Sequence, residues 1–294
     1  MATVRDSLLE PTRRILAGMH RAQLNRLDAA ITDTQDTVTL DFDTKGIVPS
    51  TVLAVDDELM YVWSLSGTNQ VVVQRGHNGS VAVEHLAGAL VEINPRFSQL
   101  DVRNEIRNEI RAWHPHLYAV VTKELTVASQ KRAADLNASV SKDFFHVLRT
   151  VREPRTGRDS WFPVHARAEH DMNTTDFPSG TAVFLDDPVE KAARIRVTYA
   201  TRFNTDTLDD ETDLEEDILL APSQFDIVPF GVAWRVVSTR EVRRTDTEAQ
   251  GEPRDAQEVP PGHIIQTARQ LKNMRDERIR DESIALRHRW GVRK

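Results

Sequence analysis

Apolar residues recur at intervals of mostly three and four along residues 4–31, which predicts an amphipathic helix at the start of the chain. Pro11 interrupts the pattern, so we expect the helix to begin or to bend there. Five arginines make the segment basic, either as a solvated face or as a surface against an acidic neighbour: Arg5, Arg13, Arg14, Arg21 and Arg26. The pattern therefore predicts a basic N-terminal helix within residues 1–35.

The pattern changes over residues 36–95, where short β-rich runs alternate with turn residues. Asp56 and Asp57 follow the apolar run 52–55 and are typical of a tight hairpin turn. Residues 76–80 contain two glycines, which suit a loop with positive backbone φ angles. These features predict a small antiparallel β module of about five short strands.

Residues 96–245 combine the three-to-four-residue spacing of helices with the alternating pattern of strands. Ser98, with Asp101 in the capping-box position, predicts a helix that runs to about residue 113. Residues 117–203 contain mainly strand patterns and predict an inserted, sandwich-like β unit. Further helices are predicted over the acid-rich residues 212–220 and over residues 227–245.

The end of the chain changes again. Residues 246–262 are polar and rich in proline and glycine, which predicts an extended linker. Residues 263–294 hold nine Lys or Arg residues against four acids and predict a basic helical arm. We expect the apolar stripe of this arm to find no partner in its own chain. The predicted fold class is α+β: a helical core layer with an inserted antiparallel β unit, a small N-terminal antiparallel β module and a long C-terminal helical arm.

Tryptophans mark expected packing sites. Four of them sit inside apolar patterns and are predicted core anchors: Trp63, Trp113, Trp161 and Trp234. Trp290 differs because basic residues surround it near the end of the chain. Since Trp and Arg are favoured anchor residues of protein interfaces, we expect Trp290 to contact a partner.

Composition narrows the possible functions. The chain has 294 residues and a net charge of −7, which argues against a free-standing nucleic-acid binder. The absence of cysteine excludes disulfides, thiolate zinc sites and cysteine catalysis. No apolar run approaches the ~20 residues that span a bilayer, and the N-terminus lacks the apolar core of a secretion signal. We therefore expect a soluble protein that is made in the cytoplasm.

Motifs for catalysis and ligand binding are missing from the sequence. It has no nucleotide-binding glycine loop, no nucleophile elbow and no H-E-x-x-H zinc motif. His165 and His170 fall on opposite faces of a predicted strand, so a shared metal ion is not expected. The acids of residues 206–217 are consistent with a hard-cation site, an acidic contact surface or plain solvation. We expect no enzymatic activity, no cofactor and no metal.

Three stretches resemble a known family. The first runs from Glu58–Trp63 through residues 73–80 to residues 85–91. Its residues 75–91 have the form RGxxGSxAxxHxxGAxV, a hairpin pattern common in structural proteins of tailed bacteriophages. The helix predicted over residues 96–113 follows directly. Residues 225–235, then 259–262 and the basic terminal helix, complete the order. In this order the stretches resemble the head-to-tail adaptor (connector) proteins of phages that infect actinobacteria.

The resemblance implies a structural virion protein at the head–tail junction. Such adaptors form a ring, commonly dodecameric, beneath the portal, where core helices surround a DNA channel. The implied partners are the portal protein, the next neck or tail ring, further copies of the chain, and double-stranded DNA passing without sequence-specific binding; no membrane is involved. The alternative is another neck or tail protein, such as a stopper, a tail terminator or a baseplate component. A cell-wall hydrolase would need paired catalytic carboxylates, and no pair stands out.

Two sets of candidate interface residues follow from the charges and from the resemblance. The portal-interface candidates are Leu271, Met274, Arg287, Arg289, Trp290, Arg293 and Lys294. The candidates for acidic contacts between subunits are Asp209, Asp210, Glu211, Asp213, Glu215 and Glu216. We expect the acids to meet Arg or Lys residues of a neighbouring chain in a ring.

Overall fold

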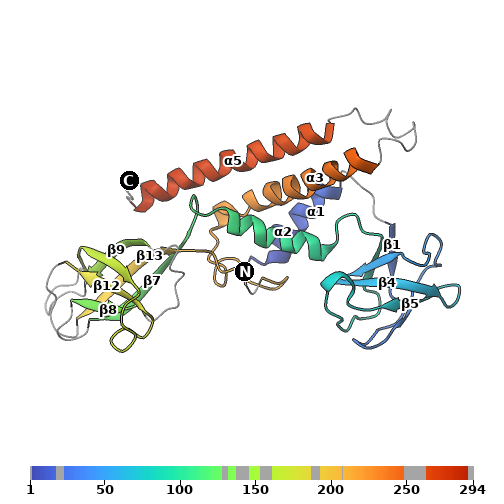
Figure 1. Cartoon of the computed structure of the whole chain (residues 1–294), viewed down its shortest axis with the longest axis horizontal. Coiled ribbons are helices and arrows are strands. Elements are labelled where there is room, and N and C mark those ends of the chain that lie inside the picture. The colour runs from blue at the N-terminus through green and yellow to red at the C-terminus, as the bar shows by residue number, and fades with distance from the viewer. Residues whose placement is uncertain are drawn as a thin grey trace. The chain divides into compact units, whose positions relative to one another are not determined.

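The computed structural model describes residues 2–17, 23–127, 132–136, 146–152, 161–186, 193–206, 208–247 and 263–290. The fold is α+β, as predicted, with helices and antiparallel sheets both well represented (Figure 1). The chain divides into two compact units. The first unit consists of residues 4–109 and 228–274, and the second of residues 1–3, 110–227 and 275–294.

The first unit opens with a π-helical turn, η1 (Arg5–Leu9), which continues into helix α1 (Glu10–Ala17). The helix predicted over residues 4–31, and with it the helical segment 1–35, is wrong in its second half. Strand β1 (Gln23–Arg26) lies there and pairs antiparallel with β6 (Leu90–Ile93). In so short a segment, apolar positions three or four residues apart are compatible with a helix or with a strand. Pairing with β6 makes this segment a strand.

Six strands of the first unit form one curled sheet around a single core (Figure 1). Its order is β1-β6-β3-β4-β5-β2, with β2 at Thr37–Thr39, β3 at Val52–Val55, β4 at Glu58–Leu65 and β5 at Gln70–Gln74. The outer strands meet, because Asp28 N–H donates to Thr39 O and Asp41 N–H donates to Arg26 O, at 3.0 and 2.9 Å. The sheet therefore closes on itself, which protects edges that would otherwise invite strand pairing.

Helices α2 (Gln99–Ala112) and α3 (Ile227–Thr247) confirm two predictions. Ser98 Oγ accepts the N–H of Asp101 at 3.1 Å and caps α2, as its sequence position indicated. The buried Glu109 carboxylate of α2 accepts a hydrogen bond from Arg235 Nε of α3 at 2.7 Å. Gly231 makes room for this carboxylate, because a Cβ at that position would overlap it.

The β strands of the second unit form two further sheets, and neither contains a strand from residues 23–93. One sheet has the order β10-β9-β13-β7 and the other the order β11-β12-β8. Leu125, Val183 and Ile195 come from both sheets and share one core, which is the predicted sandwich-like packing. The strands are β7 (Ala119–Thr126), β8 (Ala133–Asp135), β9 (His146–Arg152), β10 (Phe162–Pro163), β11 (Ala166–His170), β12 (Thr181–Leu185) and β13 (Arg194–Thr201).

The acid-rich segment that follows contains no helix over residues 212–220, so that prediction is wrong. Leu214, Ile218 and Leu220 are buried, but turns and the N-terminus hold the segment. Leu214 N–H donates to Ala2 O at 2.9 Å, and Asp213 forms a β-bridge with Thr3. Leu219 has a φ of 65°, which a right-handed helix excludes. A short 3₁₀ turn, η3 (Pro222–Gln224), leads into α3.

Helix α5 (His263–Trp290) confirms the predicted C-terminal helix. The expectation that its apolar stripe has no partner in its own chain is wrong, because Ala268, Leu271 and Ile279 are buried. Helix α3 extends to Thr247, and the rest of the predicted linker, 248–262, lies outside the described residues. None of the helices that the structure describes is long and apolar enough to cross a membrane.

Candidate functional site

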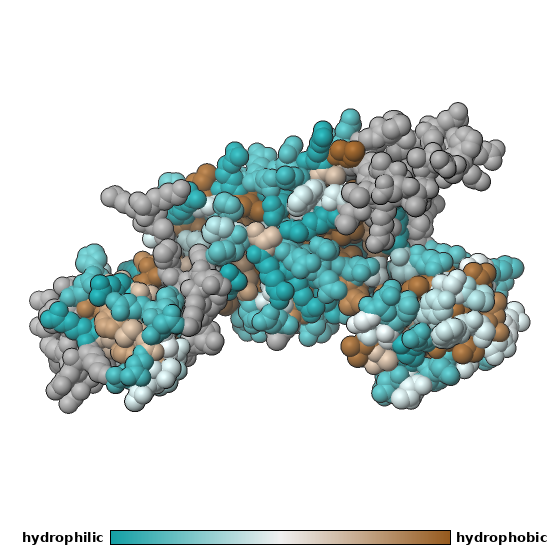
Figure 2. All heavy atoms as spheres, viewed as in Figure 1, coloured by the Kyte–Doolittle hydropathy of each residue, from teal (hydrophilic) through white to brown (hydrophobic). Residues whose placement is uncertain are grey.

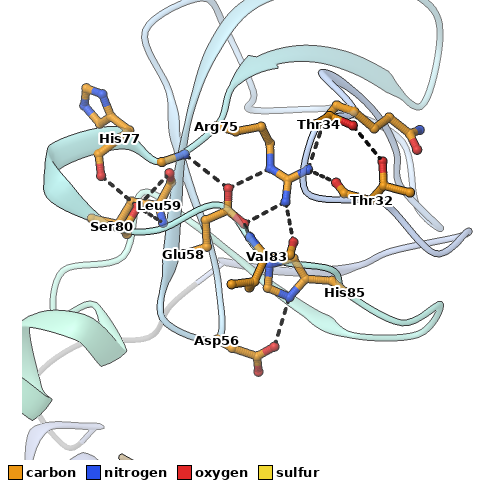
Figure 3. Close-up of polar contacts among 12 residues, drawn as sticks. Thr32, Thr34, Asp56, Glu58, Leu59, Arg75, His77, Ser80, Val83 and His85 are labelled. Carbon is orange, nitrogen blue, oxygen red and sulfur yellow. Dashed lines mark hydrogen bonds and ion pairs between the residues drawn. The ribbon is translucent and has the colours of Figure 1, made fainter.

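The residues of the phage-like hairpin pattern meet in one polar cluster of the first unit (Figure 3). Glu58 opens β4, and Arg75 follows the last residue of β5. The guanidinium holds both carboxylate oxygens, with Nε–Oε1 at 2.6 Å and Nη2–Oε2 at 2.7 Å. Both side chains are buried, at 0% exposure for Glu58 and 7% for Arg75. Such a two-pronged, charge-assisted pair is among the strong polar interactions in proteins.

Arg75 also ties neighbouring segments to this pair. Its guanidinium donates to the carbonyl of Gln35 at 2.9 Å, to that of Val83 at 2.6 Å and to that of Thr32. The Glu58 carboxylate accepts the N–H groups of Gly76 and Val83, each at 3.2 Å. One ion pair therefore organises the segment before β2 and the long loop between β5 and β6.

His85 brings a second charged group into the cluster (Figure 3). Its Nε2 lies 3.0 Å from Glu58 Oε2, and its Nδ1 lies 3.2 Å from Asp56 Oδ2. Burial opposes the charged imidazolium, but the hydrogen bonds with Asp56 and Glu58 outweigh it and raise the pKa of His85 above 6.5. The hydrogen bond with His85 lowers the pKa of Asp56. The hydrogen bonds with Arg75 and Val83 outweigh burial and lower the pKa of Glu58.

The glycine-containing loop of the pattern supports the same cluster. Gly76 and Gly79 have φ angles of 62° and 82°, as the two glycines indicated. Ser80 Oγ accepts the N–H of Leu59 at 3.0 Å and donates to the carbonyl of His77 at 2.9 Å. The conspicuous residues of the pattern therefore make internal contacts. These contacts stabilise the fold and leave no free acceptor on Glu58, since each of its oxygens already accepts hydrogen bonds from several donors.

The acidic candidates between subunits divide into two groups. Asp213 is buried and caps the following turn, where its Oδ1 accepts the N–H groups of Glu215 and Glu216 at 2.8 and 3.1 Å. Asp209 holds the side chain of Thr212 at 2.7 Å. Side chains at four of the six positions are exposed: Asp209, Glu211, Glu215 and Glu216. Asp210 is half-buried. The Asp213 carboxylate therefore makes its hydrogen bonds within its own chain.

The portal-interface candidates on α5 also differ from one another. Leu271 is buried at 8% exposure, whereas Met274 is 46% exposed. Arg287 and Arg289 are exposed, and the guanidinium of Arg289 lies 5.6 Å from the centre of the half-buried Trp290 ring. Candidates Arg293 and Lys294 lie outside the described residues. Only part of the predicted set therefore offers a free surface.

The helix α5 is held by polar contacts as well as by burial. In the first unit, Lys272 Nζ lies 5.5 Å from the centre of the Trp234 ring. In the second unit, Arg278 Nε bonds Asp226 Oδ2 at 2.8 Å, and Ser223 Oγ donates to Glu282 at 3.0 Å. The hydrogen bond with Asp226 raises the pKa of Arg278.

The tryptophan predictions have mixed outcomes. Trp113 is fully buried and is the core anchor that its pattern indicated. Trp63 is 60% exposed on β4, so its assignment to the core is wrong. Trp161 and Trp234 are half-buried. Met60 and Val62 of β4 pack into the core, so Trp63 falls on the opposite side of the strand beside Tyr61, where it is the extra residue of a bulge between Val62 and Ser64.

Comparison with known proteins gives no relative: no family model matches the chain, and no curated protein matches it significantly. The chain is therefore characterised by its own geometry. It is an α+β protein with a closed β module, a β sandwich and long helices.

Proposed function

We propose that this chain is a non-enzymatic structural virion protein. In this proposal it is a head-to-tail adaptor that forms a ring beneath the portal, joins the capsid to the tail and lines the DNA passage. The observation that carries the proposal is the cluster of Glu58, Arg75 and His85. The residues of the phage-like pattern bond to one another and stabilise the β module, which is the role expected of such residues in a structural protein.

The chemistry of the cluster supports a structural role over a catalytic one. A catalytic carboxylate needs room for a substrate, and a general base needs a free lone pair close to it. Glu58 is fully buried and receives hydrogen bonds from Arg75, Gly76, Val83 and His85. Its pKa is lowered, so it is a stable anion and a poor proton acceptor.

The charge of the chain supports a passage that does not hold DNA. Proteins that grip double-stranded DNA neutralise phosphates with many Lys and Arg residues. This chain carries a net charge of −7 and keeps several acids exposed in residues 209–216. A ring of such chains would repel the phosphate backbone and let DNA slide.

Binding to portal is the direct test of this function. The full-length protein would be mixed with portal-containing, tail-less capsids and sedimented, and the pellet would be examined by electron microscopy in negative stain. An adaptor cosediments and adds a ring below the portal vertex. If the protein does not bind these capsids but binds purified tails, it is a different neck or tail component, and the adaptor assignment is wrong.

A further inference from the structure

One loop segment of the β module has the backbone bonding of a strand without belonging to the six-stranded sheet. Residues 81–87 lie in the long connection between β5 and β6. Positive φ angles of 82° bound this stretch at Gly79 and Gly88, and none occurs among residues 81–87, which the structure describes in full. The bridge Ile31↔His85 pairs the segment with the residues that precede β2. We call residues 82–86 the edge segment.

Alternate residues of the edge segment bond to the module (Figure 3). Val83 N–H donates to Glu58 Oε2 at 3.2 Å, and Val83 C=O accepts a hydrogen bond from Arg75 Nη2 at 2.6 Å. His85 N–H donates to Ile31 O at 3.0 Å, and His85 C=O accepts the N–H of Ile31 at 2.9 Å. The backbone groups of residues 83 and 85 are therefore turned towards the module.

The residues between them carry backbone groups without a partner. Four such groups remain unbonded within the described part of the chain: the C=O of Ala82, the N–H and C=O of Glu84, and the N–H of Leu86. Glu84 and Leu86 are exposed, Leu86 at 80%. Because the backbone groups of successive residues in a strand point to opposite sides, these four groups form one row that faces away from the module. Such a row is what the edge of a sheet offers to an added strand.

The edge segment is held in place at both ends. Before it, Arg75 is bonded to the buried Glu58. After it, Gly88 N–H donates to Leu27 O at 2.7 Å, and Ala89 C=O accepts the N–H of Leu27 at 3.0 Å. A partner strand would therefore bind an edge that is already ordered, which lowers the entropy cost of binding. Closed sheets protect their edges, so an ordered edge that stays unpaired points to a partner.

Negative charge around the edge segment restricts its partner. The edge loop 75–89 and residues 27–36, which bond to it, hold four exposed acids that have no ion-pair partner among the described residues: Asp28, Asp33, Asp36 and Glu84. The one cation of these two stretches, Arg75, is neutralised by Glu58, and the neighbouring Arg26 donates to Gly88 O at 3.1 Å. Two copies paired through this edge would bring like charges together, which disfavours a second copy as the occupant. The partner strand must be basic.

Apolar side chains along the same loop offer further contacts. Val81, Val83 and Leu86 are 73, 44 and 80% exposed. On the face of the module that Figure 2 shows, apolar and polar residues are likewise interspersed. A partner at this edge is therefore recognised by main-chain hydrogen bonds together with single apolar groups, which is the pattern of strand addition and not of helix docking.

We propose that the edge segment binds an extended, basic segment of another protein as an added β-strand. The backbone of the partner bonds to the free groups of Ala82, Glu84 and Leu86. Its Lys or Arg side chains lie near Glu84 and Asp33, and apolar side chains at intervening positions contact Val83. This interaction goes beyond the adaptor function and does not depend on it, because it rests on the backbone geometry of the β module.

The first experiment selects binders from a library of random ten-residue peptides displayed on yeast, with the full-length protein as target. We expect enriched peptides to carry Lys or Arg at alternating positions. Binding of a selected peptide, measured by fluorescence anisotropy, should fall at least about tenfold in Glu84→Pro, because proline removes a backbone donor from the edge. Glu84→Gln is the matched control, since it keeps the donor and removes only the charge, and it should weaken binding less than about fivefold. Circular dichroism and the midpoint of unfolding establish whether both variants fold.

The second experiment changes the peptide and leaves the protein intact, so it decides the matter even if Glu84→Pro does not fold. Two versions of the selected peptide carry N-methyl groups on its odd or on its even residues. Because only alternate amides of an added strand bond to the edge, one version should lose binding at least about tenfold and the other should keep it. The amides of Glu84 and Leu86 should also exchange hydrogen more slowly when the unmodified peptide is bound. Failure to select any basic peptide, or an equal effect of the two methylation patterns, would overturn the proposal.

Discussion

Arg75 binds Glu58 on the neighbouring strand of the β4–β5 pair and holds both of its oxygens, although 17 positions separate the two residues in the chain. The pair joins the start of β4 to the end of β5. The same guanidinium reaches the carbonyls of Gln35 and Val83. This one relationship fixes the loops that carry the phage-like sequence pattern.

Removing one partner of this pair should strongly destabilise the first unit. Glu58→Gln keeps the size of the side chain but leaves the buried Arg75 charge without its counter-ion, at a cost of about 3–5 kcal/mol in the free energy of unfolding. Urea unfolding of the full-length protein measures this loss. Glu124→Gln is the matched control: its partner Arg196 lies 2.6 Å away, but both side chains are more than 40% exposed. This exposed pair should contribute only about 0–1 kcal/mol.

The stability of the first unit should fall as pH rises above 6.5, the unfolded pKa of His85. His85 has a raised pKa in the folded state, so its charged form stabilises the fold fully below its unfolded pKa of 6.5. That contribution disappears as pH rises through the higher folded pKa. The pKa values of Asp56 and Glu58 are lowered in the folded state, so their charged forms stabilise the fold above their unfolded pKa values. That contribution is lost only as pH falls into the acidic range.

Urea midpoints between pH 5.5 and 9 measure this dependence. His85→Gln should remove most of the decline that begins above pH 6.5, because its amide cannot gain a charge. His77→Gln is the control, since the half-buried His77 ring lies 5.2 Å from the Tyr61 ring at a tilt of 40° but has no carboxylate contact among the described residues. Equal pH profiles for the wild type and His85→Gln would contradict the assignment.

Gly231→Ala should destabilise the packing of α2 against α3. The added Cβ would overlap the carboxylate of Glu109, which is fully buried and bonded to Arg235. We expect a loss of about 1–3 kcal/mol, the usual cost of overpacking, despite the better helix propensity of alanine. In Gly67→Ala the new Cβ would come no closer than 3.7 Å to Gln70. Thermal unfolding should show a small change for this control, and similar losses in both variants would argue against the clash.

Helix α5 should contribute to the stability of the chain. Leu271→Ala should cost about 2–4 kcal/mol because Leu271 is buried, whereas Met274→Ala, one turn away and 46% exposed, should cost less than about 0.5 kcal/mol. Deletion of residues 263–294 should lower the unfolding midpoint, since it exposes apolar surface and removes the ion pair of Arg278 with Asp226. A deletion variant as stable as the full-length chain would restore the view of α5 as an independent arm.

Elements that depend on local interactions were predictable from the residues themselves. Ser98 and the apolar period after it defined α2, and the period over residues 227–245 defined α3. The paired glycines at Gly76 and Gly79 defined their turn, because positive φ is a property of the local backbone. The division into a first β module and a second β unit also followed from the helical pattern of residues 96–113 between them.

Other elements depend on partners that lie far away along the chain. Residues 23–26 became a strand because β6 pairs with them, and residues 212–220 became turns because Ala2 and Thr3 bind there. Packing of Met60 and Val62 into the core of the closed sheet placed Trp63 on the outer side, and burial of Leu271 converted an expected free arm into a packed helix. These outcomes are set by contacts between residues far apart in the chain, which a local pattern of polar and apolar residues does not encode.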